Sequence, residues 1–377
     1  MEKHLHIITL TVPYPVDYGG VFDLFYKLSA LQQTGVHIHL HCFDYGRGQQ
    51  PELNRYCASV NYYERKSWPL SFSNELPYIV ASRKNDALLD ELLKDDYPIL
   101  MEGIHCSYLL TDERFANRKT YLRLHNVEYE YYQHLTASAT SFIKKRFYKR
   151  ESELLHQYEK AIANKPTAIW SVTKKDALTY RREFNCNCIE YLPLFLSPDW
   201  KVDSIVGKGT YCFYQGDLSV DANAKAATWL LKEVFNDVEI PFVLAGKNPS
   251  KKLIKLAHAQ MHTCIVANPC DREMQDMVRR SHMHILPSYS NTGIKLKLLN
   301  ALFNGRHCLV NNDTVEGSGL ESLCHIANSA TGFKEKVKEL YEKSFTCNEI
   351  DKRKALLNNM FNNKANAKRI NESIWGE

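Results

Sequence analysis

The sequence predicts an α/β protein built from two Rossmann-like, doubly wound domains that face each other across a cleft. Short apolar or alternating runs end in turn residues and are followed by helical patterns, and this cycle occurs twice along the chain. Alternating strands and helices predict parallel sheets with right-handed crossovers. At 377 residues, the chain also exceeds what one hydrophobic core usually supports.

Eleven strands are expected, each a short run rich in apolar or β-branched residues. In the first half they span residues 4–10, 36–43, 99–102, 120–124, 168–172 and 189–192. In the second half they span residues 211–215, 242–245, 264–267, 284–287 and 308–311. Helical patterns fill the segments between them, as a doubly wound fold requires.

The domain boundary is expected within 193–209, which has no helical period. Four turn-forming residues lie there: Pro193, Pro198, Gly207 and Gly209. This boundary gives a first domain over 1–200 and a second over 201–347. The segment 348–377 is polar and helical, and its apolar end, Ile374-Trp375, could anchor it on either domain. We expect it to pack back on the N-terminal domain.

The charge balance excludes a strongly basic protein. Residues 1–200 carry 24 Lys and Arg against 24 Asp and Glu, which leaves 24 basic and 19 acidic residues in 201–377. The net charge of +5 therefore lies in the second half. This excess is too small for a nucleic-acid-binding domain, and it fits a protein that holds a nucleotide diphosphate.

The sequence shows no targeting signal and no membrane span. The first ten residues lack a basic stretch followed by a long apolar run, and no segment reaches about 18 consecutive apolar residues. The eleven cysteines have no zinc-ribbon or disulfide-framework spacing. We therefore expect a cytoplasmic protein with reduced thiols.

Two lysines stand where a helix is expected to begin. In the segment 287–305, Lys295 and Lys297 follow a polar loop that contains Gly293. A helix N-terminus carries partial positive charge and unsatisfied N–H groups, so cations there cost stability unless an anion binds. A phosphate-bearing ligand is the simplest guest.

Paired glycines follow the first expected strand. The loop 13–20 ends in Gly19-Gly20 and opens a helical pattern. Glycines let the backbone approach a ligand closely, but the loop lacks the Gly-x-Gly-x-x-Gly spacing of dinucleotide sites. An ordinary strand-to-helix turn explains the loop equally well.

Histidines follow two strands of the first half. His125, beside Asn126, lies just beyond the strand over 120–124, where a histidine can hydrogen-bond a sugar hydroxyl or a leaving group. His105, after the preceding strand, is the weaker candidate. The alternative is a loop histidine whose ring is satisfied by backbone groups.

Three further histidines, His37, His39 and His41, share one face of the second strand. Such a row could ligate a metal ion, but no carboxylate accompanies it, and a polar cover near the sheet edge explains it equally well. The helical pattern over 142–162 carries a basic aromatic run that could touch an anionic membrane surface. A solvated helix laced with ion pairs is the favoured alternative.

Read in order, five stretches resemble glycosyltransferase family 4, the retaining nucleotide-sugar transferases with the two-Rossmann GT-B fold. They are residues 13–20, 124–132, 213–218, 243–247 and 285–305. The resemblance implies a donor nucleotide sugar bound mainly by the second domain and an acceptor bound mainly by the first. It spans nearly the whole chain in family order.

The resemblance also implies roles for single residues. Gly19 and Gly20 match the loop that approaches the donor diphosphate, and His125 matches a histidine near the reacting centre. Gly293 and Ile294 match the loop whose backbone amides meet the donor. Further donor-side positions are Gly216, Lys247, Thr292, Lys297 and Asn300, and the acceptor-side positions are Asp17, His105 and Asn126.

The chain departs from the family at the positions that usually carry charge. Two glutamates of many relatives are replaced by Thr292 and Asn300, and an arginine and a lysine by Asp217 and Asn223. Lysines 247, 295 and 297 offer a physical replacement, because fixed cations stabilise the charge of a departing phosphate. We therefore expect a divergent branch in which Lys295 acts with His125 in catalysis.

The expected function is a metal-independent, retaining glycosyltransferase of hexosyltransferase type in bacterial polysaccharide or glycolipid synthesis. It would use a nucleotide-sugar donor and a glycan or lipid-linked glycan acceptor, with no cofactor, no metal and no nucleic acid. Peripheral contact with the inner face of the membrane is an option. The alternatives are a catalytically degenerate donor-binding partner subunit and a nucleotide-sugar epimerase. A dehydrogenase is disfavoured, because neither half shows the dinucleotide fingerprint.

Overall fold

The computed structural model describes residues 2–16, 19–67, 71–139 and 141–376. The chain forms two compact units. The N-terminal unit comprises Met1–Gln133, Arg146–Ser197 and Phe361–Glu377, and the C-terminal unit comprises His134–Lys145 and Pro198–Met360. The boundary between the two units therefore falls between Ser197 and Pro198, inside the stretch 193–209 where the sequence places it.

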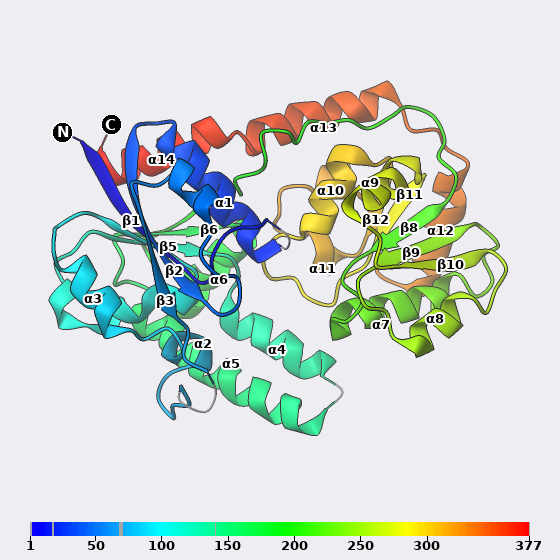
Figure 1. The fold of residues 1–377 in the computed structure, drawn as a ribbon. Coiled ribbons are helices and arrows are strands. Elements are labelled where there is room, and N and C mark those ends of the chain that lie inside the picture. Colours follow the sequence, from blue (N-terminus) through cyan, green and yellow to red (C-terminus); the bar gives the residue numbers. More distant parts are fainter. Residues whose placement is uncertain (1, 17–18, 68–70, 140, 377) are drawn as a thin grey trace. The chain divides into compact units, whose positions relative to one another are not determined.

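The N-terminal unit contains a seven-stranded parallel sheet in the order β3-β2-β1-β4-β5-β6-β7 (Figure 1). Its strands are β1 (Lys3–Thr9), β2 (Val36–Asp44), β3 (Ser59–Glu64), β4 (Ile99–Glu102), β5 (Thr120–Leu124), β6 (Ala168–Ser171) and β7 (Ile189–Tyr191). The strand order reverses between β1 and β4. In doubly wound sheets, such a reversal opens a crevice at the carboxyl ends of the strands.

Helices cover both faces of this sheet (Figure 1). They are α1 (Gly19–Gln32), α2 (Tyr78–Ala81), α3 (Asp86–Leu92), α4 (Glu128–Ser138), α5 (Phe142–Ile162), α6 (Lys174–Phe184) and α14 (Asn363–Trp375). Successive strand residues feed opposite cores: Leu100 packs with α1 and α14, and Met101 packs with α3 and α5. Both faces are therefore apolar, as in a fully covered parallel sheet.

The C-terminal unit contains a six-stranded parallel sheet in the order β10-β9-β8-β11-β12-β13. Its strands are β8 (Cys212–Gln215), β9 (Phe242–Gly246), β10 (Thr263–Ala267), β11 (Met283–Leu286), β12 (His307–Val310) and β13 (His325–Ile326). Its helices are α7 (Asp221–Trp229), α8 (Lys251–Ala257), α9 (Asp271–Arg280), α10 (Leu296–Asn304), α11 (Asn312–Val315), α12 (Ala330–Tyr341) and α13 (Cys347–Met360). The predicted α/β class, with two doubly wound parallel sheets, is confirmed.

All eleven expected strands are present, and two further strands were not expected. β3 is half-buried at one edge of the first sheet, and β13 has only two residues at an edge of the second. The C-terminal segment divides between the units, since α13 belongs to the C-terminal unit and α14 to the N-terminal unit. Ile374 is buried with Ala367 and Ile370 in the core beneath α1.

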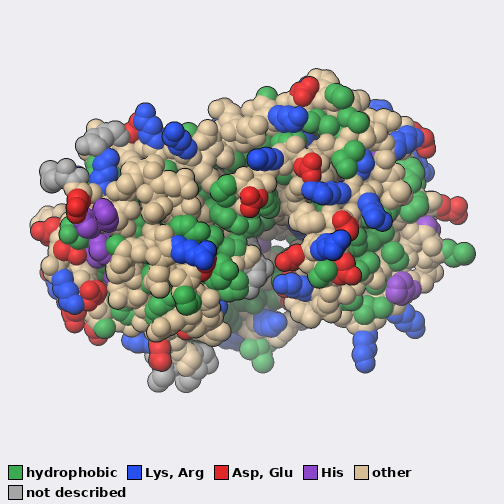
Figure 2. Space-filling view, turned by 45° about the horizontal axis from the view of Figure 1, so that its top comes forward, with side chains coloured by type: hydrophobic (Ala, Val, Ile, Leu, Met, Phe, Trp, Pro, Cys, Tyr) green, Lys and Arg blue, Asp and Glu red, His purple; other side chains and the backbone are tan. Residues whose placement is uncertain are grey.

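The surface carries both signs of charge. On the face drawn in Figure 2, basic and acidic side chains are interspersed over both units. Phe142 and Ile143 are exposed at the start of α5, directly before Lys144 and Lys145. Across the described residues, no helix is both long enough and apolar enough to cross a membrane.

Candidate functional site

The carboxyl edge of the first sheet holds a histidine and a carboxylate in direct contact. Glu102 is the last residue of β4, and His125 follows β5. Glu102 Oε2 lies 3.1 Å from His125 Nε2. Glu102 is 1% exposed, whereas the His125 side chain is 18% exposed. The buried Glu102 carboxylate accepts a hydrogen bond from His125 Nε2–H. It thus orients an imidazole that reaches the surface.

The other carboxylate oxygen of Glu102 anchors a buried ion network. Lys27 on α1 donates to Glu102 Oε1 at 2.6 Å and to Asp23 Oδ2 at 2.9 Å. Arg123 on β5 donates to the same Asp23 oxygen at 3.0 Å, and the Phe195 amide donates to Asp23 Oδ1 at 2.7 Å. Two cations therefore balance two anions where no water reaches them.

This balance keeps both carboxylates ionised. Burial alone would raise the pKa of Asp23, but Arg123 and Lys27 hold it well below its usual range. Burial would likewise raise the pKa of Glu102, but Lys27 and His125 lower it. At neutral pH, His125 therefore contacts a carboxylate anion.

Sequence reasoning found His125 but missed the four charged residues behind it. Asp23 and Lys27 are spaced i,i+4 within an otherwise apolar helix, and Arg123 stands inside a buried strand. Charges in apolar elements are rarely buried unless they are paired. That mismatch between residue and element was the available signal.

The same network bears on metal binding. Asp23, Glu102 and His125 offer ligand atoms within 4.8 Å of one another. However, the Lys27 ammonium already contacts both carboxylates. A metal ion would have to displace this buried cation, so the residues present fit an internal lysine better than a divalent ion.

The two other acceptor-side candidates of the described residues lie near this edge. Among the described residues, His105 Nδ1 is buried without a hydrogen-bond partner, and burial together with Arg83 lowers the pKa of His105 well below its ordinary value. Asn126 Nδ2 lies 3.5 Å from Glu128 Oε1. Burial raises the pKa of Glu128 to about 7, which makes this carboxyl group an unexpected acid/base candidate. Asp17, the third candidate, lies outside the described residues.

The glycine pair of the first loop opens a helix. α1 begins at Gly19 and continues through Gly20, so these backbone N–H groups belong to its first turn. The first four N–H groups of a helix have no intrahelical partner. This is the geometry on which the expected contact with a diphosphate depends.

In the C-terminal unit, two strand ends pack backbone against backbone. Gly216 follows β8, and Gly246 ends β9. A Cβ atom at Gly246 would lie 1.8 Å from the Gly216 carbonyl oxygen. No side chain fits at Gly246, so only glycine allows this close approach of the two strand ends. Lys247 follows Gly246 directly and is exposed.

The predicted lysine-bearing helix start is observed. α10 begins at Leu296 with Lys295 as its N-cap residue, and its first turn contains no acidic residue. Gly293 in the preceding loop has a φ of +61°, a left-handed conformation that favours glycine. Lys295 Nζ donates to the Thr292 carbonyl oxygen.

Lys297, in the first turn of α10, is a partly buried cation that contacts an amide and an aromatic ring. Its Nζ lies 3.2 Å from Asn223 Oδ1 and 3.4 Å from the Tyr214 hydroxyl, and 4.9 Å above the Tyr214 ring. Within the described part of the chain, it forms no salt bridge. Burial and the neighbouring Lys295 lower the pKa of Lys297 to about 8.

The positions that the resemblance singled out as departures bond local neighbours. Thr292 is buried and its hydroxyl lies 3.1 Å from that of Ser290. Asn300 Oδ1 accepts from Asn304 Nδ2 at 2.8 Å. Asn223 Oδ1 accepts from the Lys297 ammonium. A cation therefore reaches the side chain at position 223 from a different helix.

The histidine row on β2 is hydrogen-bonded to its neighbours. His41 bonds His6 on β1 at 2.9 Å and the Tyr63 hydroxyl on β3 at 3.1 Å. His39 likewise bonds His4 at 3.0 Å and Ser59 at 2.9 Å. Both ring nitrogens are used in each case, which supports the polar-cover interpretation over a metal site.

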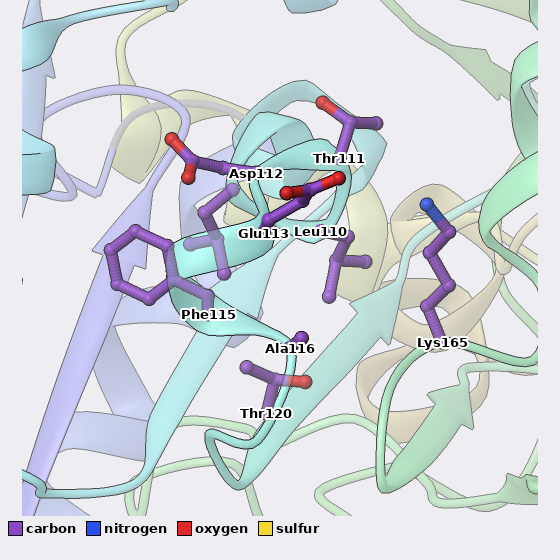
Figure 3. Close-up of a pocket in the computed structure, with 9 residues that line it drawn as sticks. Leu110, Thr111, Asp112, Glu113, Phe115, Ala116, Thr120 and Lys165 are labelled. Atoms are coloured by element: carbon purple, nitrogen blue, oxygen red, sulfur yellow. The ribbon is translucent and has the colours of Figure 1, made fainter.

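A separate cavity of about 300 Å³ lies at the opposite ends of the strands, away from His125 and Glu102 (Figure 3). It is lined by residues 109–113 with Phe115, Ala116, Thr120 and Lys165. Thr120 is the first residue of β5, so the cavity adjoins the amino ends of the strands. It does not include His125 or Glu102 and belongs to a different part of the unit.

Comparisons with known proteins bear on this architecture. No protein-family model matches the chain. A Klebsiella pneumoniae protein described as an uncharacterized 44.6 kDa protein in the cps region is 25% identical over 336 residues, covering 83% of this chain and 84% of that protein.

Solved structures resemble almost the entire chain, and two of them illustrate the likeness. An E. coli trehalose-6-phosphate structure bound with UDP-2-fluoro glucose gives a TM-score of 0.65 at 12% identity, covering 99% of each chain. WaaG, a glycosyltransferase involved in lipopolysaccharide biosynthesis, gives 0.63 at 12% identity, covering 99% of this chain and 100% of WaaG. At such identities the likeness concerns the fold, and the predicted GT-B fold is confirmed.

Proposed function

We propose that the protein is a glycosyltransferase that moves a sugar from a nucleotide-diphosphate sugar to a glycan or glycolipid acceptor. In this reaction, the bond between sugar C1 and the diphosphate oxygen breaks, and a bond from C1 to an acceptor hydroxyl oxygen forms. The hydroxyl proton passes to the leaving diphosphate or to solvent. The nucleoside diphosphate leaves with additional negative charge. Stabilising that charge is the main electrostatic demand of the reaction.

The observation that carries this proposal is the start of α10. Lys297 is a half-buried cation in the first turn of a helix, beside Lys295 and without an acidic partner in that turn. Both burial and the helix dipole disfavour a cation there. A bound diphosphate would reverse both effects, because it supplies the missing counter-charge and accepts the free N–H groups of the helix.

The N-terminal unit supplies a suitable group for the sugar. His125 is held by the Glu102 anion, and its ring is partly exposed at the carboxyl edge of the sheet. Such a ring can hydrogen-bond a sugar hydroxyl in a fixed orientation. Retention of configuration and independence from metal are part of the proposal. The lysines of α10 offer the cationic charge that a metal supplies elsewhere.

The acceptor class is proposed from two supporting facts. The relative encoded in a cps region and the fold shared with WaaG both favour polysaccharide or glycolipid synthesis. The exposed Phe142 and Ile143 beside Lys144 and Lys145 favour peripheral contact with a membrane that carries a lipid-linked acceptor.

A second candidate is a donor-binding partner subunit without transfer activity. It is favoured by Thr292 and Asn300, whose side chains bond local neighbours where relatives present glutamates. This candidate keeps nucleotide-sugar binding but loses turnover, so the two functions separate in one assay.

The test is release of nucleoside diphosphate from a panel of UDP, GDP, CDP and dTDP sugars, measured with and without bacterial lipid-linked oligosaccharide extract. Turnover of one donor, stimulated by the extract, is expected. Binding of a donor without release of nucleoside diphosphate would support the partner-subunit function instead. No binding and no turnover across the panel would contradict both.

A further inference from the structure

A second cluster of ligand-type side chains lies in the C-terminal unit, apart from the residues discussed above. His307 is the first residue of β12, His325 the first residue of β13, and Glu349 lies on α13. Each offers one ligand atom, and the three atoms lie within 4.8 Å of one another. The residues line a cavity of about 180 Å³.

The hydrogen bonding of His307 leaves one of its ring nitrogens available to a metal ion. It is 2% exposed, and its Nε2 lies 3.1 Å from the Lys343 carbonyl oxygen. A carbonyl oxygen only accepts, so the ring proton resides on Nε2 and Nδ1 carries a lone pair. Nδ1 is buried without a hydrogen-bond partner among the described residues. This is the tautomer and support that metal-bound histidines show.

Glu349 and His325 complete the group. Glu349 Oε2 accepts from the Thr346 amide at 2.8 Å and from its hydroxyl at 3.0 Å. That bonding leaves Oε1, which lies 3.5 Å from His307 Nδ1. The His325 ring centre is 5.5 Å from that of His307, with the two planes tilted by 57°.

We propose that His307, His325 and Glu349 bind a zinc ion through His307 Nδ1, a ring nitrogen of His325 and Glu349 Oε1. Two imidazoles and one carboxylate, with a fourth position open to water, form a ligand set that suits Zn²⁺. Hard cations such as Mg²⁺ prefer oxygen ligands and are disfavoured by the two nitrogens.

The competing interpretation is an ion pair between protonated His307 and Glu349. The 3.5 Å between His307 Nδ1 and Glu349 Oε1 is longer than the roughly 2.7–2.9 Å of a charge-assisted hydrogen bond, so the two groups are not in direct hydrogen-bond contact. Three of the cations near this cluster bond other groups. Lys336 and Lys343 both pair with Glu339, and Arg353 donates to the Gly305 carbonyl oxygen at 2.7 Å.

The ion would have a structural role, because its ligands lie at the amino ends of β12 and β13. His307 and His325 open their strands, whereas Gly216, Gly246 and the α10 loop follow the carboxyl ends of theirs. The ion would tie the two-residue edge strand β13 to β12 and α13. Such a strand has few hydrogen bonds of its own, so a metal tie contributes directly to folding. This role is independent of the proposed transfer reaction.

The experiment uses the full chain, stripped of metal with a chelator and then titrated with ZnCl₂. Calorimetry and metal analysis should show one tight Zn²⁺ per chain, and Zn²⁺ should raise the melting temperature by about 4 °C or more, while MgCl₂ should not. His325→Ala and Glu349→Gln should each weaken the tight site at least about tenfold and abolish the thermal shift.

Exposed cysteines can also bind zinc, so matched controls decide the outcome. Cys347→Ser removes the exposed thiol nearest in sequence, and His258→Ala removes an exposed histidine of the same unit. Both controls should retain the tight site. The proposal is overturned if wild type shows no tight Zn²⁺, or if His325→Ala and Glu349→Gln bind Zn²⁺ as wild type does.

Discussion

At the scale of single residues, the Glu102–His125 pair is the most informative contact of the N-terminal unit. Glu102 joins the exposed imidazole to the buried ions Lys27, Asp23 and Arg123. Its charge therefore has two tasks: it orients a ring at the surface, and it balances a lysine in the interior. The two tasks predict two separable effects of one substitution.

Glu102→Gln preserves the shape of the side chain but removes its charge. We expect turnover to fall by about 10- to 100-fold, because a neutral amide positions the imidazole less firmly. We also expect the free energy of unfolding to fall by about 3 kcal/mol, because Lys27 loses one of two buried counter-ions. Steady-state kinetics and urea denaturation measure the two effects.

Glu113→Gln serves as the control, because that carboxylate is exposed and lies outside the network. It should change neither quantity. If Glu102→Gln has wild-type turnover while its stability falls, the carboxylate is structural only, and His125 does not depend on it.

Single residues also show which features of the site can be predicted from the sequence. Lys297 could be singled out because a cation at a helix start contradicts a local rule. Its contacts with Asn223 and Tyr214 could not be predicted, because they join α10 to β8 and α7 across about 70 to 85 positions of sequence. Glu128 was missed for a similar reason: its burial depends on tertiary packing.

At the scale of elements, the pairing of β1 with β2 has a consequence for pH. The two strands align His6 with His39 and Ile8 with His41, and His6 bonds His41 from the adjacent register position. Burial, followed by the effect of His6, lowers the pKa of His41 to about 3. In the unfolded chain, the same ring has a pKa of about 6.5.

The unfolded chain therefore binds more protons than the folded one between about pH 6.5 and pH 3. Stability is fully present above this window and is lost as the pH falls through it. We expect wild type to lose about 2 kcal/mol more than His41→Gln between pH 7 and pH 5. Urea denaturation at several pH values measures this difference, and equal losses in both proteins would show that His41 does not control the acid response.

Elements were predicted where periodicity is strong and missed where it is weak. The central strands are apolar or alternating runs bounded by turn residues, and all of them were found. β3 lies at a sheet edge, and its residues are at most partly buried. β13 is too short to show a period. The zinc cluster escaped for a related reason, since its members are spread over β12, β13 and α13.

At the scale of the whole molecule, alternation of strands and helices was enough to predict two parallel sheets. This succeeds because right-handed crossovers leave few other ways to pack such a sequence. Function is less determined by the fold, because the GT-B fold hosts different donors and acceptors, and specificity resides in a few side chains. The proposed function places the lysines of α10 among those side chains.

In the proposed function, Lys297 receives the diphosphate of the donor. Calorimetric titration with UDP, GDP, CDP and dTDP tests it directly. We expect one of these to bind, Lys297→Met to weaken binding by at least about tenfold, equivalent to about 1.4 kcal/mol, and Lys297→Arg to retain most of it. Lys232→Met, which removes an exposed lysine of the same unit, should bind as wild type. Binding by Lys297→Met at wild-type affinity, or no binding by the wild-type chain, would contradict the claim.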